Sequence, residues 1–352
     1  MDNYFSPSKQ DEQLGDDIEI VIVFHVANDS TPDPDRKASA YIRSFDRQLR
    51  QISVFLKSIA LFTVTPVHCA VVCDSEATYK RVLALIKNWK PLYRNRVSLS
   101  YHRIIYPKST EYLKYLNRPW ASSRHFIAQQ FPNRKKIIDF DTDIIMLTPM
   151  EDLAAHFENF NSKQIVGMSK MIYAVNKRFR MFPKPQHGLL DDGINCGVAL
   201  LRLDRWRKAF PNYLQQVNQW YAEYGKYFVF PTQDLFNVWL GTHKSHYYEL
   251  PCEWNVRPTI FKLKNPRQWR SLLHPGRAAF VNGAKALHAA GGHFTDGTPG
   301  WSDVFNSFEK HDMTTDTLAD LRNSILENLK DNSPKLQKLI LKQLLQTIDK
   351  AV

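Results

Sequence analysis

Three aspartates alternate within the short segment KKIIDFDTDIIML, residues 135–147. Apolar residues flank them on both sides, which is typical of a strand buried on both faces. In a continuous strand, Asp139, Asp141 and Asp143 would share one face and their carboxylates would repel one another. Burial of unpaired carboxylates is costly or forces them to take up protons. The segment therefore needs a positive counter-charge, or the chain must turn at the end of the strand.

A divalent cation is one such counter-charge. Two carboxylates two residues apart at a strand end, such as Asp141 and Asp143, suit a hard ion such as Mg²⁺ or Mn²⁺. The ion would offset their repulsion and could bridge to a diphosphate. An Asp-x-Asp pair alone is common, and exposed turn carboxylates are its usual explanation. The apolar flanks of this pair favour the metal site.

The elements around this segment alternate between strand and helix. The sequence predicts strands at 18–26, 67–73 and 97–105, and helices at about 43–62, 77–89 and 122–131. This alternation predicts an α/β fold with a parallel sheet. Ligands of such sheets bind at the carboxyl ends of the strands, where Asp141 and Asp143 are expected.

Composition narrows the class of protein. The chain has 352 residues, 43% of them hydrophobic, and eight Trp, as expected for a globular protein with a sizeable core. No window approaches the roughly 18 apolar residues of a membrane span. The polar start has no apolar signal-peptide core, so we expect a chain that is soluble where it is made or one that has lost an anchor. The formal charge of +12 favours anionic partners, but no nucleic-acid-binding motif accompanies it.

The four cysteines form neither a zinc motif nor a disulfide framework. Cys69 and Cys73 lie in one predicted strand with their Cα atoms roughly 13 Å apart, which is too far for a bridge. A Cys196–Cys252 bridge stays open.

Several ordered motifs resemble the retaining glycosyltransferases of family 8, which have the GT-A fold. The run IIDFDTDIIMLTPMEDL is similar to the Asp-x-Asp strand of that family. Further similar stretches are GINCGVALLRLDRWR (193–207), PTQDLFNVWL (231–240) and YELPCEWNVRP (248–258). The last of these, with 58–74 and 118–132, resembles the glucoside and xyloside xylosyltransferase branch. The resemblance implies a single Rossmann-like domain with a mixed, mostly parallel central sheet.

The resemblance also suggests how the chain is divided. It runs from about residue 18 to 310, which we predict to be the GT-A glycosyltransferase domain. Residues 1–17 are predicted to be a flexible tail. Residues 311–352 are predicted to be a helical extension, with one helix in 317–329 and another in 335–349.

The resemblance implies a metal and donor site. Asp141 and Asp143 match the metal- and nucleotide-binding pair, with Mn²⁺ or Mg²⁺ as the ion. The third ligand is a histidine, for which we favour His288 over His293. The donor-binding residues that we assign, besides Asp141, are Arg124, His25, Gly197 and Gly291. Arg124 could instead be an exposed helix residue. Gly291 belongs to the stretch AAGG, whose backbone can approach a phosphate closely. The lysine usual in this loop is not evident, and Lys285 is no clear substitute.

The same resemblance implies catalytic positions. Asn195 matches a residue lining the donor-sugar pocket, and Gln233 and Asp234 match residues beside the anomeric carbon. Asp192 is an alternative base or sugar contact. Cys196 replaces a serine of the family, and Thr232 replaces an aspartate, unless Thr232 is the N-cap of the helix that follows. One further group of residues, Trp254, Asn255 and Arg257, is assigned to the acceptor side of the site. For Trp254, a place in the hydrophobic core is an equal alternative.

The implied function is metal-dependent transfer of a sugar, xylose first, from a UDP-sugar to a glycan or glycoprotein hydroxyl with UDP as leaving group. Family analogy implies the lumen of the endoplasmic reticulum or Golgi, without nucleic acid as a partner. Another UDP-hexose donor, or a non-catalytic sugar- or nucleotide-binding relative, remains an alternative. A phosphatase of the haloacid dehalogenase type is disfavoured, because its aspartates lie on the first strand of the fold.

Overall fold

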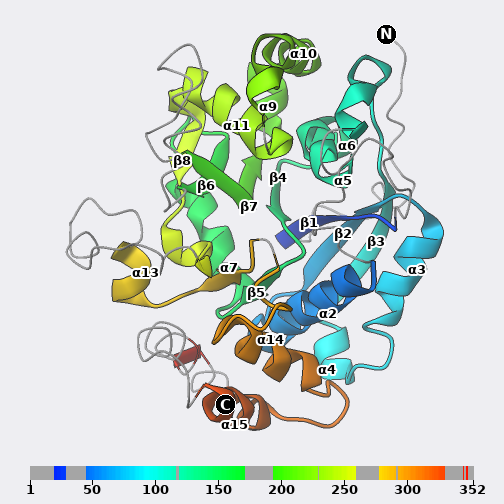
Figure 1. Ribbon diagram of the computed structural model, residues 1–352, viewed down its shortest axis with the longest axis vertical. Coiled ribbons are helices and arrows are strands. Elements are labelled where there is room, and N and C mark those ends of the chain that lie inside the picture. The colour runs from blue at the N-terminus through cyan, green and yellow to red at the C-terminus, as the bar shows by residue number, and fades with distance from the viewer. Residues whose placement is uncertain are drawn as a thin grey trace.

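The computed structural model describes residues 20–28, 45–115, 119–170, 193–228, 230–258, 277–290, 292–329 and 344, 346 and 347. Its centre is a seven-stranded sheet in the order β3-β2-β1-β4-β7-β6-β8 (Figure 1). The strands are β1 (Ile20–Val26), β2 (Val67–Cys73), β3 (Val97–Arg103), β4 (Lys136–Phe140), β6 (Val166–Lys170), β7 (Ile194–Arg202) and β8 (Tyr247–Glu249).

The sheet is mixed and mostly parallel, as predicted. Strand β1 pairs in parallel with β2 and β4, and β2 pairs in parallel with β3. Strand β7 runs antiparallel to both β4 and β6, and β6 is parallel to β8. A separate antiparallel pair joins β5 (Ile144–Met146) to β9 (Ala286–His288) beside the end of β4.

Helices cover both faces of the sheet. One face carries α2 (Phe45–Phe62), α3 (Glu76–Ala84), α4 (Pro91–Arg94), α7 (Met150–Ala154), α14 (Trp301–Lys310) and α15 (Leu318–Asn328). The other carries α5 (Pro119–Ser122), α6 (Ile127–Gln130), α9 (Leu203–Ala209), α10 (Tyr213–Tyr224) and α11 (Pro231–Thr242). Short pieces complete the described chain: α13 (Arg277–Asn282) and 3₁₀ turns at Lys108–Tyr115, Ser123–Phe126, Ala155–Asn159, Gly225–Tyr227, Lys244–His246 and Cys252–Trp254.

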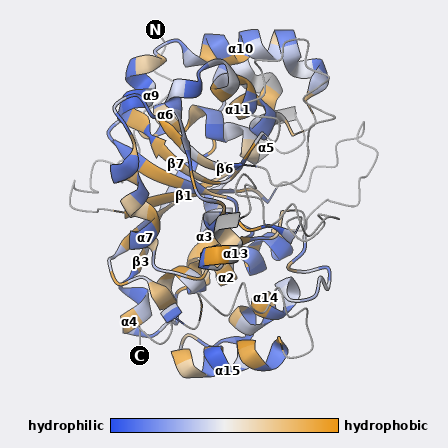
Figure 2. Ribbon diagram, turned by 90° about the vertical axis from the view of Figure 1, so that its left-hand side faces the viewer, coloured by the Kyte–Doolittle hydropathy of each residue, from blue (hydrophilic) through white to orange (hydrophobic). Residues whose placement is uncertain are grey.

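The two helical layers explain the unbroken apolar strands. In β1, Ile22 and Phe24 belong to one hydrophobic cluster, and Val21 and Val23 belong to the cluster on the opposite face. Figure 2 shows the hydrophobic strands in the interior and helices of mixed hydropathy around them. A strand covered on both faces gains stability from apolar residues at every position, rather than at alternate ones.

Two predicted helices differ from the observed ones. The helix predicted at 77–89 ends at Ala84 and continues as tight turns, whose backbone hydrogen bonds join residues three apart, such as Leu85 N–H to the Val82 carbonyl at 3.1 Å. The helix predicted at 122–131 is divided into α5, a 3₁₀ turn at Ser123–Phe126, and α6. Arg124 therefore lies on a 3₁₀ turn, which aims its side chain toward the end of β4.

The first predicted C-terminal helix exists as α15, where Leu321 and Ile325 are buried in the cluster of α2 and α14. The predicted tail at 1–17 lies outside the described residues, as does the helix at 335–349 apart from 344, 346 and 347. In the part of the chain that the structure describes, no helix combines the length and apolarity needed to cross a bilayer.

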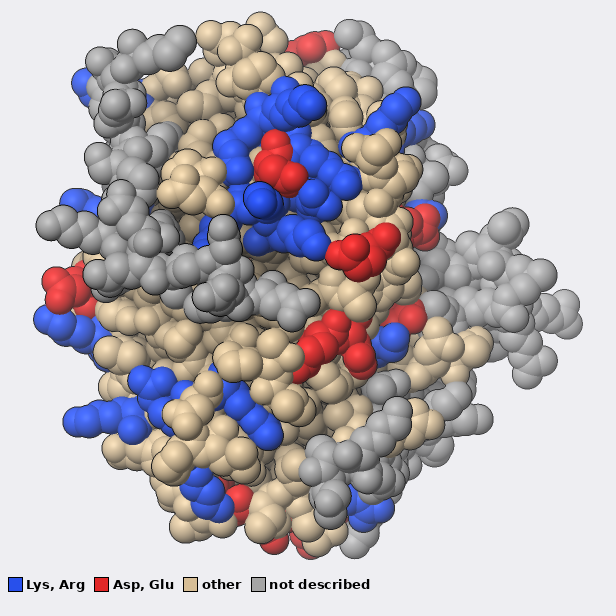
Figure 3. Space-filling model, turned by 180° about the vertical axis from the view of Figure 1, so that it is seen from behind, with Lys and Arg blue, Asp and Glu red and all other residues tan. Residues whose placement is uncertain are grey.

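Basic side chains gather on the back of the molecule around a few acidic ones (Figure 3). Near the start of β4 and α9, Lys136 pairs with Glu158 at 2.9 Å and Arg202 pairs with Asp204 at 2.9 Å. Arg205 donates to the backbone oxygens of residues 161 and 164. These partners indicate a solvated, partly neutralised surface, at the end of β4 opposite Asp141.

A buried row of polar side chains on β2 and β3 gives the fold a pH dependence. His68 contacts Ser98 and Ser100 through its two ring nitrogens, at 2.8 and 2.7 Å, and Ser100 contacts His102 at 2.8 Å. Burial lowers the pKa of His68 and His102 to about 4. An unfolded histidine has a pKa of about 6.5. The unfolded chain therefore binds more protons than the folded one between these values.

We expect the free energy of unfolding to fall as the pH drops from about 6.5 to about 4, and to be independent of these two groups above about pH 7. Urea unfolding at pH 7 and pH 5 measures this loss. In His68→Gln/His102→Gln the difference between the two pH values should shrink. An unchanged difference would assign the acid sensitivity to other groups.

Candidate metal and donor site

The aspartate segment turns where β4 ends. Strand β4 stops at Phe140, the chain turns through Asp141–Asp143, and β5 begins at Ile144. The backbone N–H of Asp141 donates to the carbonyl of Gly197 on β7 at 2.9 Å, which fixes the start of the turn. Asp139 remains inside the strand, 1% exposed. Of the two solutions for the carboxylate repulsion, the chain uses the turn, and it separates Asp139 from the other two.

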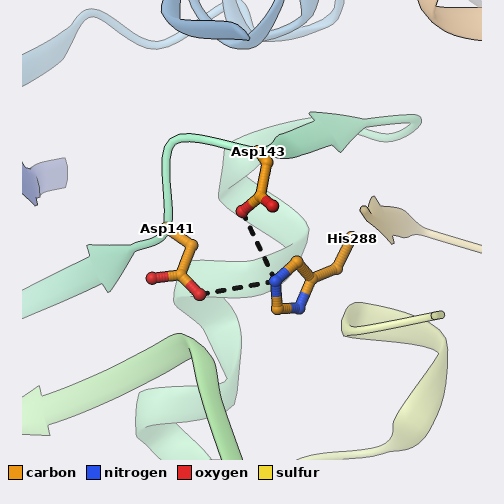
Figure 4. A group of neighbouring side chains, drawn as sticks. All are labelled: Asp141, Asp143 and His288. Carbon is orange, nitrogen blue, oxygen red and sulfur yellow. Dashed lines mark ion pairs between the residues drawn. The ribbon is translucent and has the colours of Figure 1, made fainter. Parts of the chain in front are cut away.

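Asp141, Asp143 and His288 come together beyond this turn. One ligand atom from each lies within 4.8 Å of the others. The His288 Nε2 atom is 3.3 Å from Asp141 Oδ2 and 3.5 Å from Asp143 Oδ1, so the ring nitrogen points between the carboxylates (Figure 4). The pairing of Ile144 with His288 in β5–β9 brings them together. Asp143 and His288 are buried, whereas the Asp141 side chain is 35% exposed, so the group meets solvent on the Asp141 side.

The group is strongly polarised. Burial by itself would raise the pKa of Asp141, but Arg124 and then His288 outweigh it and hold that pKa at about 2. Burial would lower the pKa of His288, but Asp143 and Asp141 outweigh it and raise that pKa above its usual value. Two carboxylates and an imidazole are a donor set that suits a small divalent ion such as Mn²⁺ or Mg²⁺. The residues present therefore fit a metal site.

A hydrogen bond sets the orientation of His288. Its Nδ1 atom is 2.8 Å from Asn255 Oδ1; an amide oxygen only accepts, so Nδ1 carries the proton and Nε2 is left to bind an ion. The ring packs directly on Gly197, where an added Cβ would lie 2.6 Å from Nδ1. His293 instead contacts Thr298 Oγ1 at 2.9 Å. The structure thus brings His288, and not His293, to the aspartate pair.

Arg124 lies between two carboxylates. Its Nε atom is 3.1 Å from Asp139 Oδ2, and its Nη1 atom is 2.9 Å from Asp141 Oδ1. Nη1 also donates to the carbonyl of Cys196 at 3.1 Å. The side chain is 3% exposed, so the alternative of an exposed helix arginine is wrong. Arg124 thus supplies a positive counter-charge to Asp139 and Asp141, in addition to the turn that separates the carboxylates.

His25 lies behind Arg124. Its Nδ1 atom is 2.7 Å from Ser123 Oγ, and its Nε2 atom is 3.4 Å from Asp139 Oδ1. The residue is 4% exposed at the end of β1. The structure therefore places His25 next to Asp139, within the interior, rather than beside Asp141 and His288 as a direct donor contact would require.

An amide network connects the predicted catalytic positions to Asp141, Asp143 and His288, the three residues that we call the metal group. Asn195 donates through Nδ2 to Gln233 Oε1 at 2.9 Å, and Asn255 donates through Nδ2 to Asn195 Oδ1 at 2.8 Å. Since Asn255 also holds His288, a continuous row runs from Gln233 to His288. Both Asn195 and Gln233 retain 8% exposure. Sequence reasoning placed Asn195 and Gln233 here but missed the role of Asn255.

Asp234 and Thr232 lie at the start of α11. The Oδ2 atom of Asp234 accepts a hydrogen bond from the backbone N–H of Phe230 at 2.8 Å, which stabilises the start of the helix. This oxygen is therefore already engaged within the protein. The N-cap residue is Phe230, so the alternative assignment of Thr232 as N-cap is wrong. Thr232 instead accepts, through its backbone oxygen, a contact from His125 Nε2 at 3.1 Å. Asp192 and Gly291 lie outside the described residues.

The remaining predicted contacts turn inward. Trp254 is fully buried and donates through Nε1 to His156 at 2.8 Å, so it belongs to the core, as one of the two interpretations held. Arg257 is 3% exposed and donates to the carbonyl of Lys170 at 3.2 Å. Asn255 is 1% exposed. These three residues form part of the interior behind the metal group, and the assignment to an acceptor surface is wrong.

The loop after His288 lacks the expected lysine, but a cationic side chain from α2, Arg47, lies against it. Lys285 lies over the Trp254 ring, with Nζ 4.8 Å from its centroid, and so is no substitute for a loop lysine. Arg47 of α2 lies against Gly292, where an added Cβ would come 2.5 Å from Nη2. Gly292 has a φ of +125°, a conformation that residues with a Cβ rarely adopt.

The cysteines are thiols. All four are buried and free, and the Cys252 sulfur accepts from the backbone N–H of Ala279 at 3.3 Å. Burial raises the pKa of Cys196 to about 12, which keeps its thiol protonated at neutral pH. The Cys196–Cys252 bridge that the sequence left open is not formed.

Solved structures share this fold. The chain is similar to mouse xyloside xylosyltransferase 1 in its apo form, with a TM-score of 0.53 and 18% identity over 77% of this chain and 97% of that one. It is also similar to the galactosyltransferase LgtC in complex with donor and acceptor sugar analogs, with a TM-score of 0.60 and 17% identity over 87% of this chain and 100% of that one. The fold is therefore of the GT-A type, as predicted.

Sequence relatives narrow the class to a family. Residues 17–276 match the sequence model of glycosyl transferase family 8, and the chain belongs to that family. Glucoside xylosyltransferase 1 of Mus musculus is 27% identical over 239 residues, which cover 64% of this chain and 57% of the relative. The Gallus gallus protein of that name is 27% identical over 225 residues, which cover 60% and 50%. The chain thus spans about half the length of the curated relatives it matches.

Proposed function

We propose that this chain is a metal-dependent, retaining glycosyltransferase that moves a sugar, xylose first, from a UDP-sugar to a hydroxyl of a glycan or glycoprotein. The observation that carries the proposal is the Asp141–Asp143–His288 group at the end of β4, in a chain that belongs to family 8. The names of the relatives, glucoside xylosyltransferases, support xylose as the donor sugar and a sugar hydroxyl as the acceptor. Family analogy puts the reaction in the lumen of the endoplasmic reticulum or Golgi.

Asp141, Asp143 and His288 would hold the divalent ion. When bound, that ion supplies positive charge that neutralises the diphosphate of the leaving UDP. Arg124 fixes the Asp141 carboxylate through Oδ1, so that Oδ2 stays on the His288 side. Arg47, beside Gly292, adds a guanidinium at the loop that follows His288, where it would strengthen diphosphate binding.

The sugar would lie over Asn195 and Gln233. Their amide groups are joined at 2.9 Å and are held from behind by Asn255, so they are fixed before a substrate arrives. The Asn195 Oδ1 atom already accepts from Asn255 and from the backbone N–H of Gly197, whereas Gln233 Oε1 accepts only from Asn195 among these groups. The second lone pair of Gln233 Oε1 can stabilise positive charge that develops at the anomeric carbon. Asp234 has one oxygen engaged at the helix start, which makes it a weaker choice for a direct nucleophile. We therefore infer front-side attack by the acceptor hydroxyl, with the departing phosphate taking its proton.

The test is release of UDP. With Mn²⁺ and a glucoside or xyloside acceptor, wild-type protein should release UDP from UDP-xylose faster than from UDP-glucose or UDP-galactose, and EDTA should abolish release. The product should keep the α configuration of the donor, which proton NMR couplings report. A non-catalytic relative would bind UDP-sugar without releasing UDP, and a phosphatase would instead cleave a phosphate monoester; either result would contradict the proposal.

A further inference from the structure

A serine, a histidine and an aspartate lie in a row behind the metal group. Ser123 Oγ is 2.7 Å from His25 Nδ1, and His25 Nε2 is 3.4 Å from Asp139 Oδ1. The same residue types form the catalytic triads of hydrolases. Here, however, Ser123 is 0%, Asp139 1% and His25 4% exposed, so no substrate reaches the serine. The polar atoms of this row are therefore accessible only to neighbours within the protein.

One such neighbour is Arg124. Its Nε atom forms an ion pair with Asp139 Oδ2 at 3.1 Å, which lacks hydrogen-bond geometry, and its Nη1 atom lies 2.9 Å from Asp141 Oδ1. The guanidinium therefore joins a carboxylate inside β4 to a carboxylate in the turn. The hold is directional, because Arg124 engages Oδ1 of Asp141 and leaves Oδ2 facing His288 Nε2 at 3.3 Å. A planar guanidinium can fix a carboxylate in this way, where a lysine would act only as a point charge.

The charges explain why a third carboxylate is useful. Without Asp139, the whole charge of Arg124 would act on Asp141, and this pairing would compete with an incoming cation. Asp139 also pairs with the guanidinium, so the charge of Arg124 is divided between two carboxylates. His25 stays neutral in the row, since burial lowers its pKa although Asp139 opposes the change.

We propose that Asp139, supported by His25 and Ser123, is a positioning residue that keeps Arg124 in place and thereby keeps Asp141 Oδ2 available to the metal. The inference rests on the proposed function in one respect: the Asp141–Asp143–His288 group binds a divalent ion. Asp139 itself lies inside the strand and does not ligate the ion.

The first test is Asp139→Asn, which keeps the shape of the side chain and removes its charge. Mn²⁺ titration of the nucleotide-free protein, followed by electron paramagnetic resonance, gives the Kd. We expect the Kd to rise about 10-fold, the lower end of what loss of an outer-sphere partner costs. His102→Gln is the matched control, since it alters another buried polar row on the same sheet and should leave the Kd unchanged. A folded Asp139→Asn protein with a Kd within 2-fold of wild type would overturn the inference.

The second test asks whether Asp139 acts through Arg124. Asp139→Asn is measured again in an Arg124→Gln background, as a double-mutant cycle. If Asp139 works by holding Arg124, its substitution should change the Kd less than 2-fold there. An equal fold-change in both backgrounds would mean that the charge of Asp139 acts on the ion directly, which overturns the positioning role.

A third variant covers the case in which Asp139→Asn fails to fold. His25→Gln leaves Arg124 and all three aspartates unchanged and removes the ring next to Asp139. We expect a smaller rise in the Mn²⁺ Kd, about 3-fold, because the hold on Asp139 is weakened but not lost. An unchanged Kd in folded His25→Gln would contradict the claim that His25 and Ser123 support Asp139. Wild-type protein that binds no Mn²⁺ would instead contradict the proposed function itself.

Discussion

Asp143→Asn should abolish the stabilisation of this protein by UDP. In wild type, UDP with Mn²⁺ should raise the melting temperature by a few degrees, since a ligand at 100 times its Kd adds about 2.7 kcal/mol to the free energy of unfolding. UDP without the ion should give little shift. Asp143 is 4% exposed and lies 3.5 Å from His288 Nε2, so an amide in its place removes a charged ligand from the centre of the group. Differential scanning fluorimetry, with and without Mn²⁺, measures the effect.

The matched control is Asp296→Asn. Asp296 lies in the loop after His288 and is 3.3 Å from His293, outside the metal group, with its side chain 49% exposed. Its substitution should leave the Mn²⁺-dependent shift intact. A shift that survives in Asp143→Asn would rule out this residue as a ligand. A wild-type protein without any UDP shift would favour the non-catalytic alternative.

The sequence predicted β1, β2 and β3 well because both faces of the sheet are covered. The apolar runs at 20–26 and 67–73 are short and rich in Val and Ile, which favours a buried strand over a helix. The sequence did not predict the order of the strands or the antiparallel insertion of β7 between β4 and β6, because pairings between distant segments leave no local pattern. The early end of α3 shows the same limit on a smaller scale. Helical periodicity continues beyond Ala84, but the backbone there changes to turns whose hydrogen bonds join residues three apart.

The part of the site that could be predicted is the part whose residues are close together in the sequence. Asp141 and Asp143 follow an apolar strand, and that position in the sequence is enough to place them at the sheet edge. The partners of these residues come from elsewhere in the chain. Asn255 reaches His288 because residue 256 bridges to residue 287, a pairing across about thirty residues. His25 and Asp139 share a face only because β1 and β4 are neighbours. Such contacts depend on strand order, which one sequence does not reveal.

His288→Ala and His293→Ala should differ sharply in Mn²⁺ binding. The sequence offered both histidines as the third ligand, but only His288 faces the aspartate pair, at 3.3 and 3.5 Å. Loss of a direct ligand should weaken Mn²⁺ binding by more than the 10- to 100-fold that outer-sphere changes cost, so we expect roughly 100-fold or more. His293 contacts Thr298 and Asp296 instead, and its removal should change the Kd less than 2-fold.

Isothermal titration with Mn²⁺ at 20 °C gives both affinities, and near-UV circular dichroism shows whether each variant is folded. Alanine at 288 leaves space in which a water molecule could replace the imidazole as a ligand. His288→Leu fills that space with an apolar group, so it should bind Mn²⁺ no better than the alanine variant. If His293→Ala loses the metal and His288→Ala keeps it, the loop histidine is the ligand. The β5–β9 pairing would then have to rearrange on binding, because it now fixes His288, rather than His293, beside Asp143.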